Sequence, residues 1–219
     1  MATVLILVVA VTACGGTARP GVDTSPAAST AEIEALYRAR TDSARMRFTE
    51  ADVRFMTGMI AHHGQALVMA ALAPTHDASP SMRVLTARII NAQQDEIATM
   101  QQWLRGRGQS VPEVHIDGLT LRVHGAGAHQ MLMPGMLTPE QLQELDHARG
   151  REFDRLFLTF MIQHHRGAVT MVQELFATDG AGQDELAFKL ASDIQADQIT
   201  EIARMERMLN TMTPGDRGR

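Results

Sequence analysis

Two consecutive histidines occur twice in this chain, each time inside the same longer pattern. His62-His63 lies in the segment 52–69, DVRFMTGMIAHHGQALVM, and His164-His165 lies in the segment 154–171, DRLFLTFMIQHHRGAVTM. Asp, Phe, Met, Ile, both histidines, Ala and Met recur at the same places, with every position displaced by 102 residues. Because neutral imidazole is the commonest metal ligand in proteins, a duplicated pair of this kind indicates metal chemistry.

A methionine precedes the second histidine of each pair by four residues, as Met59 before His63 and Met161 before His165. Residues four apart lie on one face of an α-helix, so the thioether and the imidazole are expected side by side. Imidazole with thioether favours copper, especially Cu(I), whereas imidazole with carboxylate would also accept Zn, Cu(II) or Fe. Adjacent helical residues diverge by about 100°, so His62 and His164 are expected as alternative or secondary ligands.

A second duplicated pattern supplies polar partners for the histidines. Gln-x-x-Glu-Ile-x-x-Met begins at Gln93 and again at Gln198, which places Glu96 and Glu201 on the same helical face as the glutamines. We expect the two carboxylates to accept a ring N–H from the histidines and to orient the imidazoles toward a metal ion. Binding should then weaken as histidine becomes protonated, at a pH on the order of 6 to 7.

A structural explanation of the same residues stays open. Each histidine could hydrogen-bond a Gln or Glu of the neighbouring helix and fix the helix register without any metal. The 15 methionines could likewise fill an irregular helical core, for which their flexible side chains are well suited.

The elements that position these residues are two helical hairpins. Capping residues predict helices from about residue 50 to 73, from Ser79-Pro80 to about 104, and from Thr138-Pro139, with a break near Gly150, to about 177. A last helix should run to about residue 210, and a weakly amphipathic one covers 32–46. The expected bundle spans 31–212, with halves at about 49–106 and 138–210, and forms one all-α domain because of the duplication.

About thirty residues connect the two halves, with a small hairpin predicted across Asp117-Gly118. Such a length is unusual inside a compact domain, but a crossover between half-bundles has to travel the length of the bundle. The crossover also carries His115, His124 and His129 ahead of a methionine-rich run, MLMPGM, at 131–136. A copper site on this segment is therefore a competing hypothesis.

The N-terminal stretch is apolar and ends in a cysteine. Residues 1–13 fit a secretory signal peptide and are too few to cross a bilayer as a helix. Cys14, the only cysteine, is placed as in a bacterial lipoprotein signal, which it resembles, and 14–30 reads as a flexible tether to the outer face of the cell membrane. The alternative is a buried N-terminal segment with an ordinary cysteine.

Composition narrows the possible functions. A net charge of −5 and a pI near 6.0 provide no basic field for nucleic acid. Apolar content of 45% with only 4% aromatic residues describes a helical core of Leu, Ala, Val and Met. No Ser-His-Asp arrangement, Gly-rich phosphate loop or nucleophilic cysteine is evident, so we expect no enzyme.

The two repeats together resemble the bacterial family called domain of unknown function 305, from about residue 49 to 209. The resemblance implies a ferritin-like four-helix bundle, usually exported, with copper bound through His and Met in some members. The positions that match the family pattern are Met59, His62, His63, Met161, His164 and His165.

Three functions of different class follow as hypotheses. The first is an exported, membrane-anchored lipoprotein that binds or buffers copper; the second is a structural or adaptor bundle without metal. The third, a ferritin-type di-iron oxidase, needs Glu-x-x-His on two helices. The only such motif, Glu144 to His147, lies outside both repeats.

Overall fold

The computed structural model describes residues 29–45, 47–125 and 133–212. The expected signal peptide, Cys14 with most of its tether, His129 and Met131 lie outside these ranges. The elements are α1 (Thr30–Arg45), α2 (Glu50–Ala71), the short 3-10 helix η1 (Ala73–Thr75), α3 (Pro80–Arg105), β1 (Glu113–Asp117), β2 (Thr120–His124), α4 (Pro139–His147), α5 (Gly150–Ala177) and α6 (Glu185–Met212). Of the helices in the described ranges, none is long and apolar enough to cross a membrane.

The helix starts follow local capping chemistry. Thr49 caps α2 and forms a capping box with Asp52, and Ser79 caps α3 ahead of Pro80. Thr138 caps α4 in the same way as Thr49 caps α2. The predicted break near Gly150 is present, because α4 ends at His147 and Gly150 adopts φ +56°, a conformation that suits glycine.

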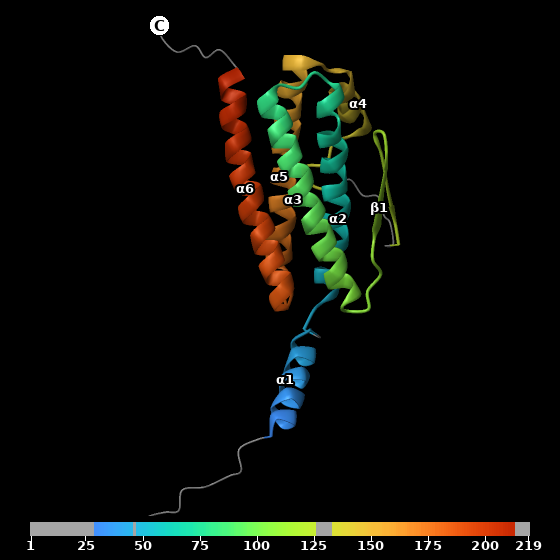
Figure 1. Ribbon diagram of the computed structural model, residues 1–219, viewed down its shortest axis with the longest axis vertical. Helices are drawn as coiled ribbons and strands as arrows, with labels where there is room; N and C mark the ends of the chain where they lie inside the picture. The colour runs from blue at the N-terminus through green and yellow to red at the C-terminus, as the bar shows by residue number, and fades with distance from the viewer. Residues whose placement is uncertain (1–28, 46, 126–132, 213–219) are drawn as a thin grey trace, which may run out of the picture. The chain divides into compact units, whose positions relative to one another are not determined.

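Four long helices, α2, α3, α5 and α6, form the bundle (Figure 1). The closest packing is of α2 on α3 and of α5 on α6, which makes two hairpins, and α2 packs on α5 to join them. The predicted fold class is confirmed: a ferritin-like, all-α four-helix bundle of two duplicated hairpins. Helix α1 spans the boundary between two compact units and exposes Ile33, Leu36 and Tyr37.

The core consists of two apolar clusters, and each draws residues from both hairpins. One contains Met59 and Ala168, whereas the other contains their repeat counterparts Met161 and Ala66. Along each of the four helices, the duplicated polar residues fall between the segments that enter the two clusters. The bundle therefore has a pseudo-twofold arrangement with a polar layer between two apolar ones.

The aspartate that opens each repeat fastens one hairpin to the other. Asp52 of α2 accepts a hydrogen bond of 2.7 Å from the backbone N–H of Gly182, in the loop between α5 and α6. Its counterpart Asp154 of α5 accepts from the N–H of Ser79, in the loop between α2 and α3, at 3.3 Å. The duplication of this aspartate thus has a structural cause that is independent of any metal.

Replacing Asp52 by alanine should lower the free energy of unfolding by about 3 kcal/mol. A buried acceptor is lost, and its three donors, the N–H and hydroxyl of Thr49 and the N–H of Gly182, are left without it. Glu50→Ala is the matched control, since Glu50 is also acidic, lies in the same first turn and is exposed. The Glu50→Ala substitution should change the free energy of unfolding by no more than about 0.5 kcal/mol. Urea denaturation measures this free energy for both variants. Equal losses in the two variants would contradict the role of Asp52 in joining the hairpins.

The crossover runs along the bundle. Its predicted hairpin is present, with β1 and β2 antiparallel and Asp117 opposite Thr120. The apolar face of the hairpin packs so tightly on α2 that a Cβ at Gly64 would lie 2.9 Å from Cδ1 of Leu121. Residues 133–137 then lead to α4, which joins the second apolar cluster through Leu142 and Leu145. The crossover is therefore long because it connects opposite ends of the two hairpins.

Candidate metal site

The histidines of the polar layer between the two clusters are fully buried. His62 and His63 of α2 and His164 and His165 of α5 are each 0% exposed. Helices α3 and α6 contribute their duplicated Gln and Glu residues to the same layer: Gln93, Glu96, Gln198 and Glu201. Buried polar groups destabilise a fold unless they find partners, so their partners decide what the layer can do.

The second histidine of each pair is bonded to the glutamate that the sequence indicated. His63 Nε2 lies 2.6 Å from Glu96 Oε2, and His165 Nε2 lies 2.7 Å from Glu201 Oε2. An ionised carboxylate only accepts hydrogen bonds, so Nε2 carries the proton and, in a neutral ring, Nδ1 carries the lone pair. Neither Nδ1 atom has a hydrogen-bond partner. This is the arrangement in which carboxylates orient metal-binding histidines.

The first histidines of the two pairs meet at the centre of the bundle. The rings of His62 and His164 lie 3.8 Å apart between centroids, at an interplanar angle of 36°. His62 Nε2 donates to the backbone carbonyl of Pro134 at 3.0 Å, so its lone pair is again on Nδ1, which has no partner. Neither ring nitrogen of His164 makes a hydrogen bond of normal geometry. The crossover thus distinguishes two residues that the repeat makes equivalent.

Burial keeps these two central rings neutral. Desolvation, with the charge of His63 adding to it, lowers the pKa of His62 to about 3. Desolvation and then the charge of His62 hold the pKa of His164 well below the usual range, while the backbone of His62 acts weakly in the other direction. Both rings therefore keep lone pairs well below the pH of 6 to 7 at which ordinary histidines titrate. Proton competition at a pH of about 6 to 7, which the sequence led us to expect for metal binding, would therefore involve His63 or His165 rather than these two rings.

Unpaired polar atoms gather in this one layer. The buried side-chain atoms without a partner include Nδ1 of all four histidines, Nε2 of His164, both amide atoms of Gln93 and Oε1 of Gln198. Orphaned buried atoms are rare in folded proteins. A cluster of them, most with a lone pair, fits a ligand that brings positive charge, and the donor set is one that a soft metal ion accepts.

The candidate ligands of the layer include thioethers as well as imidazoles. Across the described ranges, no three His, Cys, Asp or Glu side chains are grouped so that they could hold an ion by themselves. Met59 and Met161 are both fully buried, but they belong to different apolar clusters. The two pairs expected from the sequence, Met59 with His63 and Met161 with His165, therefore have their methionines in different apolar clusters. Glu144 and His147, the only motif suited to di-iron chemistry, are exposed on α4.

Several residues that shape the layer were not predicted as site residues. The backbone carbonyl of Pro134 accepts a hydrogen bond from His62, and the side chain of Gln65 donates one to the backbone carbonyl of Leu137. Helix α5 accommodates this segment at Gly167, where a Cβ would lie 1.8 Å from the Pro134 oxygen. The two copies of the repeat differ at these helix positions, and such differences could have marked where the crossover packs.

If the layer binds a metal, replacing Glu96 and Glu201 together by alanine should weaken binding by about 10- to 100-fold. Without the carboxylates the proton can move to Nδ1 and the rings lose their fixed orientation. Asp95→Ala, one residue away on the exposed side of α3, is the control. Competition titrations with a copper chelator measure the difference, and equal affinities would show that the carboxylates only stabilise the fold.

The fold and the layer define a class of protein: a duplicated four-helix bundle with four imidazoles buried at its centre. The family model described as Domain of unknown function (DUF305) matches residues 52–209. The chain belongs to this family, as the repeats indicated.

Solved structures of the family have the same fold. A putative secreted DUF305 protein from Streptomyces coelicolor is 25% identical, with 77% of this chain and 98% of that chain covered and a TM-score of 0.61. A DUF305 fragment from Deinococcus radiodurans is 28% identical, with 75% and 98% covered and a TM-score of 0.60. CopM in its Cu(I)-bound form is 27% identical, with 74% and 97% covered and a TM-score of 0.54. None of the curated proteins matches the chain.

Proposed function

We propose that this protein binds copper, as Cu(I), in the buried histidine layer, and that it acts as a copper-binding or copper-buffering protein rather than as an enzyme. The observation that carries the proposal is the set of unpartnered Nδ1 atoms of His62, His63 and His165, each fixed by a hydrogen bond on Nε2. Structures of the similar protein CopM in Cu(I)-, Cu(II)- and Ag-bound forms support the choice of metal.

The chemistry follows from the ligands. Met59 with His63, and Met161 with His165, would each offer a thioether and an imidazole on one helical face. His62 and His164 would serve as alternative or secondary ligands between the two half-sites. Gln93, Glu96, Gln198 and Glu201 would surround the ligands, with the carboxylates holding the ring protons. Soft sulfur ligands should select Cu(I) over Zn.

Elemental analysis tests the proposal. The full chain, purified in detergent from cells grown with added copper and with added zinc, should retain copper and little zinc. Titration with Cu(I) against a chelating competitor then gives the affinity. If the chain retains neither metal and does not compete with the chelator, the remaining hypothesis is a structural or adaptor bundle. The His63 to Glu96 and His165 to Glu201 hydrogen bonds are also consistent with that role.

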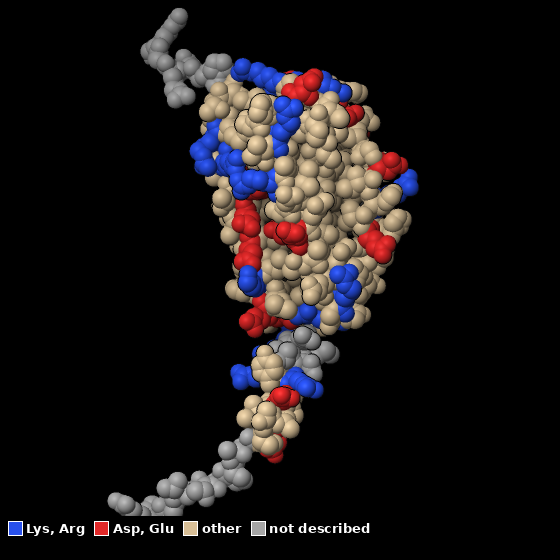
Figure 2. Space-filling model, in the orientation of Figure 1, with Lys and Arg blue, Asp and Glu red and all other residues tan. Residues whose placement is uncertain are grey.

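We also propose that the protein is exported and held on the outer face of the cell membrane through a lipid on Cys14. The support is the apolar run of residues 1–13 directly before the only cysteine. The Cys14→Ser variant should lose the lipid and move from the membrane fraction to the soluble fraction. Equal partition of the variant and the unaltered chain would show that Cys14 is not the anchor. Figure 2 shows one face of the bundle, and both acidic and basic residues lie on it.

A further inference from the structure

All six candidate ligands are 0% exposed, so an ion can reach them only if part of the cover moves or supplies ligands of its own. The cover over His62 is thin. Residues 133–137, here called the crossover strap, contact the imidazole through the Pro134 carbonyl, and Pro134 itself is exposed. The carbonyl that holds the central ring therefore belongs to a residue that is itself exposed.

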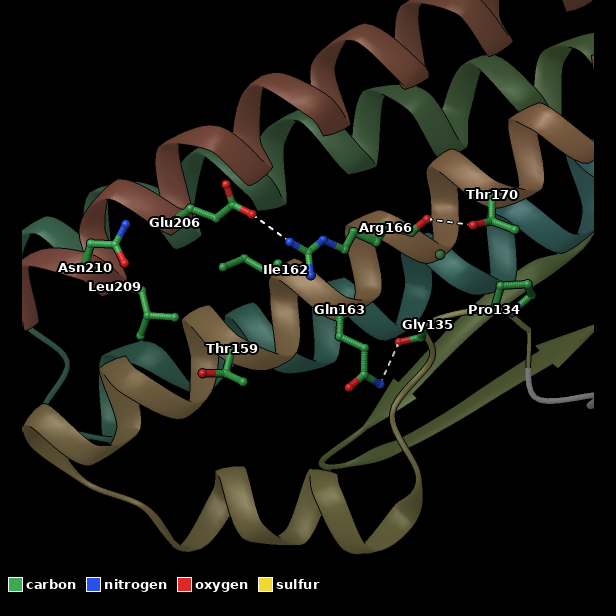
Figure 3. Close-up of a pocket in the computed structure, with 11 residues that line it drawn as sticks. Pro134, Gly135, Thr159, Ile162, Gln163, Arg166, Thr170, Glu206, Leu209 and Asn210 are labelled. Carbon is green, nitrogen blue, oxygen red and sulfur yellow. Dashed lines mark hydrogen bonds and ion pairs between the residues drawn. The ribbon is translucent and has the colours of Figure 1, made fainter. Parts of the chain in front are cut away.

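The strap is seated between α2 and α5. Gln65 of α2 makes two hydrogen bonds with the backbone of Leu137, at 3.0 and 2.7 Å. Gln163 of α5 donates to the carbonyl of Gly135 at 3.3 Å. Beside this contact an open groove of about 810 Å³ reaches the strap at Pro134 and Gly135 (Figure 3). The Arg166 to Glu206 ion pair bridges α5 and α6 in the same groove.

Two methionine side chains converge where the strap begins. A Cβ placed on Gly58 would lie 3.2 Å from the sulfur of Met133 and 3.4 Å from the methyl carbon of Met171. The repeat counterpart of Gly58 is Phe160, which is buried, so only the first half has this space. Gly58 precedes His62 by one helical turn on the same face of α2. The two methionine side chains thus meet α2 one helical turn from the histidine that the strap contacts.

The exposed fraction of the residue decreases from Met133 through Met171 to His62. Met133 is partly exposed, Met171 is 8% exposed and His62 is 0% exposed with Nδ1 unpartnered. Thioethers bind soft ions such as Cu(I) and Ag(I) in preference to Zn. The order of exposure therefore runs from Met133 through Met171 to His62, whose position on α2 is one helical turn from the place where the two methionines meet.

We propose that Met133 and Met171 form a capture site for Cu(I) at the surface of the bundle and pass the ion to Nδ1 of His62. This inference rests on the proposed function, because it adds the entry site for the same ion. The transfer is a ligand exchange: a copper–sulfur bond breaks as a copper–nitrogen bond forms. Copper remains Cu(I), and no proton is released because Nδ1 already carries a lone pair.

The test separates the rate of loading from the affinity. Cu(I) is mixed in a stopped-flow instrument with the full chain as its bicinchoninate complex, and the loss of the complex's colour is followed. The Met133→Leu/Met171→Leu variant should load about tenfold more slowly or worse, yet reach the same copper content and affinity. Met208→Leu/Met212→Leu, two half-buried methionines of α6, is the matched control and should load normally.

A second variant tests the space rather than the sulfur. Gly58→Ala places a methyl group against the Met133 sulfur and should also slow loading, while both methionines are kept. Unchanged rates in the Met133→Leu/Met171→Leu variant would overturn the capture site alone. A parallel loss of affinity would also overturn it, because the sulfurs would then be permanent ligands. An unaltered chain that takes up no Cu(I) would instead overturn the proposed function itself.

Discussion

Replacing His63 and His165 together by alanine should weaken Cu(I) binding on the order of 100-fold or more, while the helix content survives. Each substitution removes an Nδ1 lone pair that a carboxylate holds in place on the other side of the ring. Loss of a ligand should exceed the effect of losing an orienting partner, which is about 10- to 100-fold. Titration of Cu(I) against a chelating competitor measures the affinity, and circular dichroism checks the fold.

The matched control uses the two histidines of the crossover hairpin. His115 and His124 are exposed on β1 and β2, so His115→Ala/His124→Ala should leave the tight site unchanged. The competing hypothesis of a crossover site predicts the reverse order of effects. Full affinity in the His63→Ala/His165→Ala variant, with loss in the hairpin variant, would move the site to the crossover.

The metal-free protein should lose stability as the pH falls below about 6.5. The unfolded chain binds a proton on His62 near its ordinary pKa, whereas burial lowers the pKa in the folded state to about 3. Between these values the unfolded state holds the extra proton, so acid favours unfolding. For His62 alone the free energy of unfolding should be about 2 kcal/mol lower at pH 5 than at pH 7. His164 should add a change of the same sign, because its pKa is also lowered.

Urea denaturation of the metal-free protein at several pH values tests this expectation. The His62→Gln/His164→Gln variant removes both titrating rings and should flatten the dependence between pH 7 and pH 5. His147→Gln, on the exposed side of α4, is the control and should keep the original slope. A slope that is unchanged in the double variant would show that other groups cause the acid sensitivity.

The duplication explains the layer, but the crossover makes its two halves unequal. Asp52 and Asp154 fasten the hairpins in equivalent ways, and the two His–Glu bonds differ by only 0.1 Å between 2.6 and 2.7 Å. Only His62, however, meets a backbone carbonyl of the crossover. The two histidines at the centre of the layer therefore differ in their hydrogen bonding, although their sequence contexts match.

The sequence by itself determined the helices and which residues share a face. Capping at Thr49, Ser79 and Thr138 is local chemistry, and side chains three or four positions apart are neighbours on any α-helix. The pairing of Met59 with His63 is decided at this level. The duplicated Glu of the partner helix could also be matched to its histidine, because a two-helix hairpin leaves few alternatives for the register.

Three features follow from the tertiary structure alone: Nδ1 is the unpartnered nitrogen of His62, His63 and His165, the rings of His62 and His164 meet, and the crossover strap contacts His62. These features depend on contacts between segments about 70 to 100 residues apart, such as the bonds of His62 to Pro134 and of Gln65 to Leu137, and helical periodicity carries no information about such contacts. In the sequence, these contacts are marked by positions at which the two copies of the repeat carry different residues. Gly58 stands opposite Phe160, and Gln65 opposite Gly167. The crossover packs against Gly58 through Met133, against Gln65 through Leu137 and against Gly167 through Pro134, so each of these helix positions meets a different part of it.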